Sequence, residues 1–424
     1  MKLANNSLKG LRQFILWSKE MSIMNHQFPA ILIGGPPHSG KSVLIYSLTR
    51  ALREARISHY VLRACPDGEG DWAYQLPQDQ VRAIRVKGEF TPQFTQRVIS
   101  YLQHRPLPLL VDVGGKPTPE QEEIFAHCTQ AILLIGHRAD DPGAFARDLQ
   151  TWQEMMARQQ VPVMRVIQSD LQEADRLQVQ KQRDDVKSLS ALHRGTEVHG
   201  PVFETIMDEL AVSMSFPERT LAAIYKAQLP DGVAFIDLPH LAGKLGDPER
   251  YWQPDDLPYL LEQLPADQPI AVYGRSANWI YAVLALATRV PPFTMFDAKL
   301  GWVTPPTLPR RAHQPGLDDW QTHLVPQGAD FLLEMNTGSQ YLDIDEPERI
   351  PLPPVPEGTG LILSGRIPHW LVVAVCQQLA ATQSWVAVYQ PAPLQAALVV
   401  ASQWPDYPVG RLILWHTPAA KKHS

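Results

Sequence analysis

Short apolar runs alternate with helix-like patterns along the first half of the chain. Five runs predict strands, at residues 30–34, 59–64, 107–111, 131–136 and 161–167. Between and after them apolar residues recur at helical spacing, which predicts helices at 43–55, 91–102, 120–127, 141–158 and 201–212. Such alternation indicates a parallel sheet with helices on both faces, so the predicted fold class is α/β.

The second half of the chain contains an internal repeat. Residues 271–280 are similar to residues 362–371, and Gly365 follows Gly274 by 91 residues. Each copy continues as an apolar helix and then a strand. We also expect a short strand before each copy, at 233–238 and at 341–345. The repeat predicts two tandem small α+β domains after the parallel sheet.

A glycine-rich loop follows the first strand and precedes the first helix. Gly35 is followed by four residues and then by Gly40, Lys41 and Ser42. In this context the spacing is typical of a P-loop, in which backbone N–H groups and a helix N-terminus surround phosphate groups. The candidate nucleotide-binding residues are Gly35, His38, Ser39, Gly40, Lys41 and Ser42. We expect ATP as the ligand, although the sequence does not separate ATP from GTP.

Carboxylates follow two of the predicted strands. Asp112 ends the third strand, where it could act in catalysis and, with the Ser42 hydroxyl, hold Mg²⁺. The next residue, Val113, is not the glutamate that many ATPases carry there, which favours a kinase-like domain or a slow switch. The acidic loop 67–71 follows the second strand and could face the phosphates or form a solvated turn.

Composition narrows the class of protein. The 424 residues are 45% hydrophobic and 19% charged, which predicts two or three folded domains. The net charge of −6 argues against broad binding to duplex DNA. The three cysteines lack metal-ligand spacing, so we expect a reducing cytoplasm. No apolar run is long enough to span a bilayer, and we expect no membrane partner.

Each copy of the repeat carries a glycine–arginine step between a strand and a helix. Gly274 with Arg275, and Gly365 with Arg366, could each form a phosphate-binding corner from helix-start N–H groups and a guanidinium. In the alternative interpretation both arginines are structural and pair with carbonyl or carboxylate groups.

The second copy resembles the small CRISPR-associated ring nuclease family of type III systems. The resemblance lies in residues 364–366, Pro368, 370–371, 385–391 and 399–401. In the first copy, residues 296–301 are similar to the family's Phe-Asp-Pro-Arg-Leu-Gly element. Some family members are fused to a P-loop domain labelled AAA-type. The resemblance covers about the last half of the chain and implies binding of cyclic tetra-adenylate, a second messenger of antiviral defence.

The chain departs from the family in two ways. The family histidine upstream of the acidic residue is absent from 285–290 and from 376–384, and Gln390 stands where the first copy has Asp297. Asp297 and Lys299 could still polarise a phosphodiester or orient a 2′-hydroxyl. Without a general base the rate should fall about 10²- to 10⁴-fold, so binding should survive better than cleavage. Two unlike copies also suggest an internal pseudo-dimer.

We therefore divide the chain into an N-terminal helical extension (1–27), a P-loop NTPase or kinase-like domain (28–215) and two ring-nuclease-like repeats (216–312 and 313–424). The expected function is an ATP- and Mg²⁺-dependent protein of CRISPR type III defence that binds cyclic oligoadenylate, with slow cleavage left open, and that forms a homo-oligomer. Two alternatives stay open. One is a non-catalytic sensor or scaffold that responds to both ligands. The other is a small-molecule or nucleotide kinase that its C-terminal domains oligomerise.

Overall fold

The computed structural model describes residues 28–64, 92–137, 141, 143–170, 186–190, 198–248, 250–309, 320–337, 344–345, 347, 350 and 352–414. The predicted N-terminal helix, 1–27, and the acidic loop 67–71 lie outside these residues. Contacts divide the chain into two units. Unit 1 is Met1–Pro217 with Ala298–Gly301, and unit 2 is Glu218–Asp297 with Trp302–Ser424.

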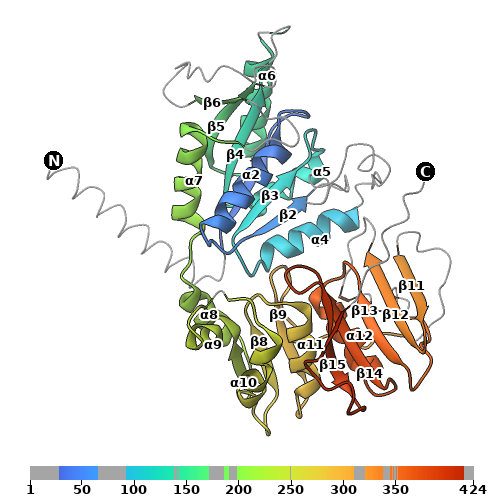
Figure 1. The fold of residues 1–424 in the computed structure, drawn as a ribbon. Coiled ribbons are helices and arrows are strands. Elements are labelled where there is room, and N and C mark those ends of the chain that lie inside the picture. The colour runs from blue at the N-terminus through green and yellow to red at the C-terminus, as the bar shows by residue number, and fades with distance from the viewer. Residues whose placement is uncertain are drawn as a thin grey trace, which may run out of the picture. The chain divides into compact units, whose positions relative to one another are not determined.

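Unit 1 is built on a six-stranded sheet with the order β2-β3-β1-β4-β5-β6 (Figure 1). Every pair of neighbouring strands is parallel. The strands are β1 (Ala30–Gly34), β2 (Tyr60–Ala64), β3 (Leu109–Val113), β4 (Gln130–Gly136), β5 (Val163–Asp170) and β6 (Val186–Ser190). The α/β prediction of a parallel sheet is therefore confirmed.

Helices cover both faces of this sheet because its central strands are apolar on both sides. On one face, α2 (Lys41–Glu54) and α7 (Pro201–Met214) pack on Ile31, Ile33 and the neighbouring apolar side chains. On the other face, Ala30 and Leu32 belong to a core that includes residues of α4 (Pro92–Gln103) and α6 (Ala144–Arg158). The predicted helix at 120–127 forms as two short pieces, α5 (Pro119–Glu122) and the 3₁₀-helix η2 (Phe125–His127).

Unit 2 contains two sheets. The first has the order β10-β9-β8-β7 and the second the order β11-β12-β13-β14-β15-β16. The strands of the first sheet are β7 (Ala234–Asp237), β8 (Ile270–Tyr273), β9 (Phe293–Asp297) and β10 (Gly301–Val303). Those of the second are β11 (Trp320–Gln327), β12 (Asp330–Thr337), β13 (Gly360–Ser364), β14 (Trp385–Gln390), β15 (Ala396–Ser402) and β16 (Leu412–Leu414). The helical elements are α8 (Glu218–Lys226), α9 (Leu238–Lys244), η3 (Pro254–Asp256), α10 (Leu257–Glu262), α11 (Asn278–Ala287) and α12 (His369–Leu379).

The two repeats have the same arrangement of strands. The order β10-β9-β8-β7 corresponds to β15-β14-β13-β12, and in both sheets the first three of the four strands in chain order are parallel. The register also agrees, because Ile270 lies opposite Phe293 and the equivalent Leu361 lies opposite Val386. The strand before the second copy is β12. Of the strand expected at 341–345, residues 341–343 lie outside the described part of the chain, and Ile344 and Asp345 form a turn.

The helices α11 and α12 join the repeats. In α11, seven successive residues from Trp279 to Ala285 are buried, and in α12 the same holds from Trp370 to Cys376. A helix that is apolar all round needs neighbours on every side. Accordingly α11 packs against α12 and also against β14 and β15 of the other repeat, while α12 contacts β9. The reciprocal packing is that of two halves related by an approximate twofold axis.

Candidate functional site

The P-loop connects β1 to α2 in unit 1. Helix α2 begins at Lys41, and its N-cap residue Gly40 has left-handed geometry, with φ 86°. Gly35 and His38 also have positive φ angles, 146° and 61°. For His38, a non-glycine residue, this conformation costs about 1–2 kcal/mol. The loop therefore holds a specific backbone path despite a local strain, and such strain is common at functional sites.

The Lys41 ammonium lies inside the loop. Its Nζ donates hydrogen bonds to the carbonyl oxygens of Gly35, at 2.8 Å, and of Pro36, at 2.9 Å. The side chain is buried, so its charge is held at the start of α2, beside the helix N-terminus. A positive charge in this position can contact the outer phosphates of a bound nucleotide.

Two hydroxyl groups, one in the loop and one on β5, fit a polar ligand. The Oγ atoms of Ser39 and Ser169 are buried and have no hydrogen-bond partner in the part of the chain that the structure describes. Both lie near Gly136, at the carboxyl end of β4: a Cβ there would stand 3.9 Å from Ser169 Oγ and 4.0 Å from Ser39 Cα. Buried hydroxyls usually have a hydrogen-bond partner. The hydroxyls of Ser39 and Ser169 could therefore each donate a hydrogen bond to an oxygen atom of a ligand.

Asp112 lies on the same face of the sheet as α2. Strands β1 and β3 are neighbours, with Ile33 opposite Asp112, and Asp112 shares the face of Leu110, which packs with α2. Asp112 is buried, and Ser42 stands in the first turn of α2. One carboxylate and one hydroxyl are hard oxygen donors, which suits Mg²⁺ that takes its other ligands from phosphate and water. Val113 points to the opposite face, into the core.

The glycine–arginine steps of unit 2 occupy equivalent turns. Gly274 and Gly365 have φ angles of 106° and 136°, so both turns need a residue without a side chain. A Cβ at Gly365 would stand 1.8 Å from the carbonyl oxygen of Met335, and one at Gly274 would stand 2.2 Å from Cδ of Pro239. The glycines thus let each turn pass close to the neighbouring segment, and Arg275 and Arg366 follow them with exposed side chains.

The approximate twofold axis passes between the first residues of α11 and α12. His369 Nδ1 lies 2.5 Å from Oδ1 of Asn278, and these residues occupy equivalent positions in the repeats, 91 residues apart. The ring of Tyr281, one turn into α11, lies 5.2 Å from the His369 ring. The Tyr281 hydroxyl donates a hydrogen bond to the carbonyl of Gly274, so the turn at Gly274 is attached to α11 near the axis. Direct contact between equivalent positions places both glycine–arginine turns, which precede these helices, next to the axis.

Sequence reasoning missed His369, Asn278 and Tyr281. The repeat alignment pairs Asn278 with His369, but nothing in the spacing shows that the two copies touch there. The segments 285–290 and 376–384, which lack the family histidine, include the ends of α11 and α12, whereas His369 is the first residue of α12.

The predicted acidic and basic residues of the first repeat lie at its strand ends. Asp297 is the last residue of β9 and is half-buried. Lys299 lies in the turn between β9 and β10, among the residues 298–301 that group with unit 1, so the two residues fall in different units. Asp297 influences the titration of both His369 and Tyr281, as does Arg275.

The electrostatics of the axis favour a neutral histidine. Surrounding protein lowers the pKa of His369, Asp297 opposes this effect, and Arg275 adds to it. His369 is exposed as a residue, so water tempers the shift. For Tyr281, burial raises the pKa of the hydroxyl, a backbone hydrogen bond involving Ser276 opposes that rise, and Asp297 adds to it.

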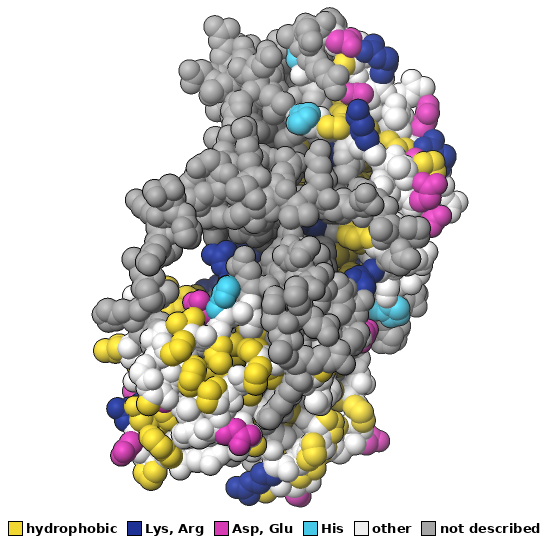
Figure 2. All heavy atoms as spheres, turned by 90° about the vertical axis from the view of Figure 1, so that its right-hand side faces the viewer, with side chains coloured by type: hydrophobic (Ala, Val, Ile, Leu, Met, Phe, Trp, Pro, Cys, Tyr) yellow, Lys and Arg dark blue, Asp and Glu magenta, His cyan; other side chains and the backbone are white. Residues whose placement is uncertain are grey.

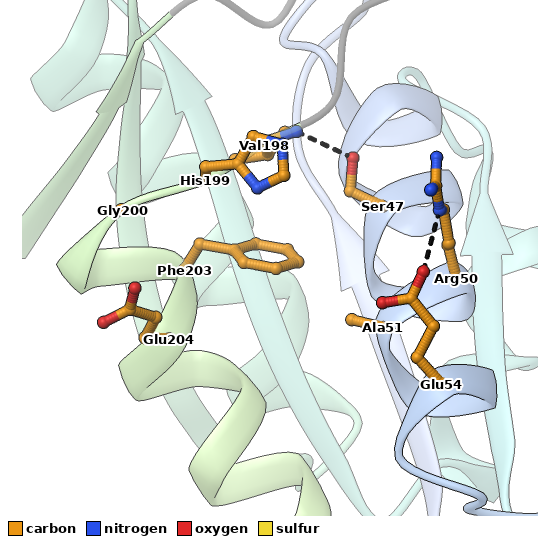
Figure 3. A pocket seen from close by; sticks show the side chains of 9 residues that line it. All are labelled: Ser47, Arg50, Ala51, Glu54, Val198, His199, Gly200, Phe203 and Glu204. Atoms are coloured by element: carbon orange, nitrogen blue, oxygen red, sulfur yellow. Dashed lines mark hydrogen bonds and ion pairs between the residues drawn. The ribbon is translucent and has the colours of Figure 1, made fainter.

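A separate hollow of about 200 Å³ lies between α2 and the start of α7 (Figure 3). Ser47 accepts a hydrogen bond from the Val198 N–H on one side, and Arg50 pairs with Glu54 on the other. The volume is below the roughly 300–1,000 Å³ of ordinary ligand pockets, and no predicted site residue lines it. We assign it no function.

Some features are absent from the described part of the chain. Within it, no group of three or more His, Cys, Asp or Glu side chains is arranged to hold a metal ion. None of the described helices combines the length and the apolar character needed to cross a bilayer. On the face in Figure 2, described Lys and Arg side chains are interspersed with Asp and Glu, so this face shows no extended basic surface.

Comparison with known proteins bears on the second repeat. No curated protein matches the chain. A crystal structure of FlhF complexed with GMPPNP and Mg²⁺ is similar over 43% of this chain and 74% of that chain, with 11% identity and a TM-score of 0.26. Residues 335–414 match the family model described as CRISPR-associated protein (Cas_csx3). This match runs from within β12 to β16, so the similarity to a CRISPR-associated family lies in the second repeat.

Proposed function

We propose that unit 1 binds a nucleoside triphosphate, ATP in the first instance, through the P-loop. Three features support this: the strained loop backbone, the Lys41 ammonium at the start of α2, and the unpaired hydroxyls of Ser39 and Ser169. Ser42 and Asp112 would hold Mg²⁺, which would neutralise phosphate charge when bound. Binding requires Lys41 to exchange its contacts with Gly35 and Pro36 for phosphate oxygens.

We further propose that unit 2 binds a cyclic oligoadenylate on the approximate twofold axis. The observation that carries this is the contact between Asn278 and His369, because it brings the two glycine–arginine turns to one axis. A ring of four identical nucleotides contains a twofold axis, which is compatible with such a site. Arg275 and Arg366 would each contact a phosphate, with the N–H groups of α11 and α12 beside them. The ligand class rests on the resemblance to CRISPR ring nucleases and on the CRISPR-associated match.

Taken together, the proposed function is a nucleotide-binding protein of CRISPR antiviral defence that recognises cyclic tetra-adenylate. A second candidate is a sensor in which ATP acts as a conformational ligand and is not turned over. Val113 favours it, since this apolar side chain points into the core, away from the P-loop face, and so supplies no carboxylate to activate water.

Calorimetry with the full chain tests both sites. We expect cyclic tetra-adenylate to bind the wild type, and Arg275→Ala and Arg366→Ala each to weaken binding at least tenfold, whereas Arg289→Ala should not. Arg289 is an exposed arginine of the same unit, after α11. We expect Lys41→Ala to abolish ATP binding and Lys226→Ala, an exposed lysine of α8, to leave it intact. Equal binding by Arg275→Ala, Arg366→Ala and wild type would refute the assignment of the axis.

ADP formation separates the two candidates. Turnover of ATP by the wild type but not by Lys41→Ala supports an ATPase or phosphotransferase. Binding without turnover supports the sensor.

A further inference from the structure

Strand β2, which is next to β3 in the sheet of unit 1, places an arginine beside Asp112 (Figure 1). The parallel register pairs Asp112 with Arg63 of β2 on one side and with Ile33 of β1 on the other. Neighbouring strands lie about 4.8 Å apart, so the Cα of Arg63 is one strand spacing from that of Asp112. Each of the three is the penultimate residue of its strand, which puts them together at the carboxyl end of the sheet.

Arg63 is also on the face of the sheet that carries α2. Val61 packs against the core on that face, whereas Leu62 and Ala64 belong to the core on the opposite face. Successive side chains of a strand alternate between faces, so Arg63 lies on the side of Val61. Asp112 lies on that side as well. An arginine and an aspartate therefore occupy neighbouring positions on the face where α2 begins.

The loop after β3 is held against the P-loop. A Cβ added at Gly115 would stand 2.4 Å from N and 2.7 Å from Cα of Pro37, so the two backbone segments are in close contact. Gly115 follows Asp112 by three residues, and Pro37 is inside the P-loop. The carboxyl end of β3 therefore borders the space that the P-loop encloses. Arg63 is one strand spacing further away and has a long side chain, which brings this space within its reach.

The strand order indicates which part of a nucleotide this side of the P-loop would face. The buried hydroxyls of Ser39 and Ser169 lie toward β4, on the other side of β1. Asp112, the proposed Mg²⁺ ligand, lies on the β3 side. Because Mg²⁺ in P-loop proteins bridges the two outer phosphates, the terminal phosphate should also lie on the β3 side. It would then have the Lys41 ammonium on one side and Arg63 on the other.

The chemistry of the side chain suits this position. Arg63 is only partly buried, so its stem can pack on the sheet while the guanidinium reaches the polar strand ends. The planar guanidinium offers paired N–H donors that match two oxygen atoms of one phosphate group.

We propose that Arg63 binds the terminal phosphate of the nucleotide and makes unit 1 selective for triphosphates over diphosphates. This inference rests on the proposed binding of a nucleotide to the P-loop. Some P-loop proteins receive such an arginine from a second protein, and others supply it from the same chain. Arg63 lies in the same sheet as Asp112, so a single chain supplies every group that contacts the terminal phosphate. A diphosphate lacks that phosphate and gains nothing from the guanidinium.

Calorimetry with the full chain and Mg²⁺, with either adenylyl imidodiphosphate or ADP as the ligand, tests this role. The wild type should bind the triphosphate analogue more tightly than ADP. Arg63→Ala should lower the affinity for the analogue about 10- to 100-fold, the range expected for the loss of a hydrogen bond between charged groups. Its affinity for ADP should stay close to that of wild type, which would also show that the variant is folded.

Two variants and a second pair of ligands serve as controls. Arg63→Lys keeps the charge without the paired donors, so it should lower the affinity for the analogue less than Arg63→Ala does and leave ADP binding unchanged. Arg53→Ala removes an exposed arginine in the last turn of α2, at the end away from the P-loop, and should bind both ligands like wild type. Tripolyphosphate and pyrophosphate have no nucleoside, and only the binding of tripolyphosphate should depend on Arg63.

The possible results separate this inference from the proposed function. Equal losses of affinity for the analogue and for ADP in the Arg63 variants would overturn it, because Arg63 would then support the site as a whole. Unchanged affinity for the analogue in Arg63→Ala, or equal affinity of the wild type for both ligands, would overturn it too. In each of these cases the wild type still binds nucleotide and the proposed function stands. Failure of the wild type to bind either nucleotide would overturn the proposed function itself.

Discussion

Replacing Gly365 by alanine should destabilise the second repeat strongly. The glycine has a φ of 136°, and an added Cβ would lie 1.8, 2.7 and 3.0 Å from the O, C and N atoms of Met335. Forcing alanine into that backbone conformation costs about 1–3 kcal/mol. Overpacking against a strand backbone, which has less freedom to move than a side chain, adds about 1–3 kcal/mol. We therefore expect Gly365→Ala to cost about 2–6 kcal/mol.

Two other glycines of unit 2 provide comparisons for the expected destabilisation. Gly328 also has a positive φ, 68°, but a Cβ there would meet nothing within 4 Å, so Gly328→Ala should cost only about 1–2 kcal/mol. Gly274→Ala should fall between the two, because its Cβ would meet the ring of Pro239, which can shift.

Hydrogen exchange measured by mass spectrometry on peptides from β12 and β13 is the suitable assay. It reports on this sheet alone, whereas a global melt of a two-unit chain need not be two-state. A difference of about 3 kcal/mol lowers protection by about a hundredfold. Equal protection in Gly365→Ala and Gly328→Ala would refute the reasoning, because it would mean that the close approach to Met335 carries no cost.

Three further predictions concern single side chains. His38→Gly should stabilise unit 1 by about 1 kcal/mol in denaturant titrations and keep ATP affinity, since it relieves the left-handed strain at φ 61°; a loss of stability would show that the imidazole has a structural contact. Burial raises the pKa of Cys128 and of Cys376 to about 12, so iodoacetamide at pH 8 should modify neither in the native chain, as peptide mass spectrometry can check. The pKa of His369 is lower in the folded chain than its ordinary value near 6.5, so the unfolded chain binds the extra proton first and stability should fall as the pH drops below about 6.5. In His369→Asn, the free energy of unfolding measured with urea should fall less between pH 6.5 and lower pH. An unchanged dependence on pH would contradict the lowered pKa of His369.

The sequence predicts the parallel sheet well where strands are buried on both faces. All residues of β1 and most of β4 are apolar, and such uninterrupted runs stand out from any surrounding pattern. The edge strand β6 was not predicted, because Val186–Ser190 is mostly polar and lies within a charged stretch that is typical of a linker. The strand β12 was misplaced for a similar reason. It pairs with β11 in a hairpin, and its acidic and amide residues interrupt the apolar pattern that would predict a strand.

The two candidate sites differ in how far the sequence reveals them. The P-loop is contiguous, so its spacing alone predicts that Lys41 lies next to Gly35. The site on the axis is assembled from residues of two repeats. The contact between Asn278 and His369 depends on how α11 packs on the opposite sheet, and that is a tertiary property. Sequence comparison supplied the equivalent positions but not their proximity.

The covalent link between the repeats has a consequence for how their shared surface can change. Two identical chains assemble only above a threshold concentration, and any substitution at their contact appears twice. Here the halves are tethered, so their pairing persists at any dilution. Each repeat can also acquire a different residue where the two repeats touch, as His369 of α12 and Asn278 of α11 illustrate. One half can thus change its residues at the contact while the other keeps its own.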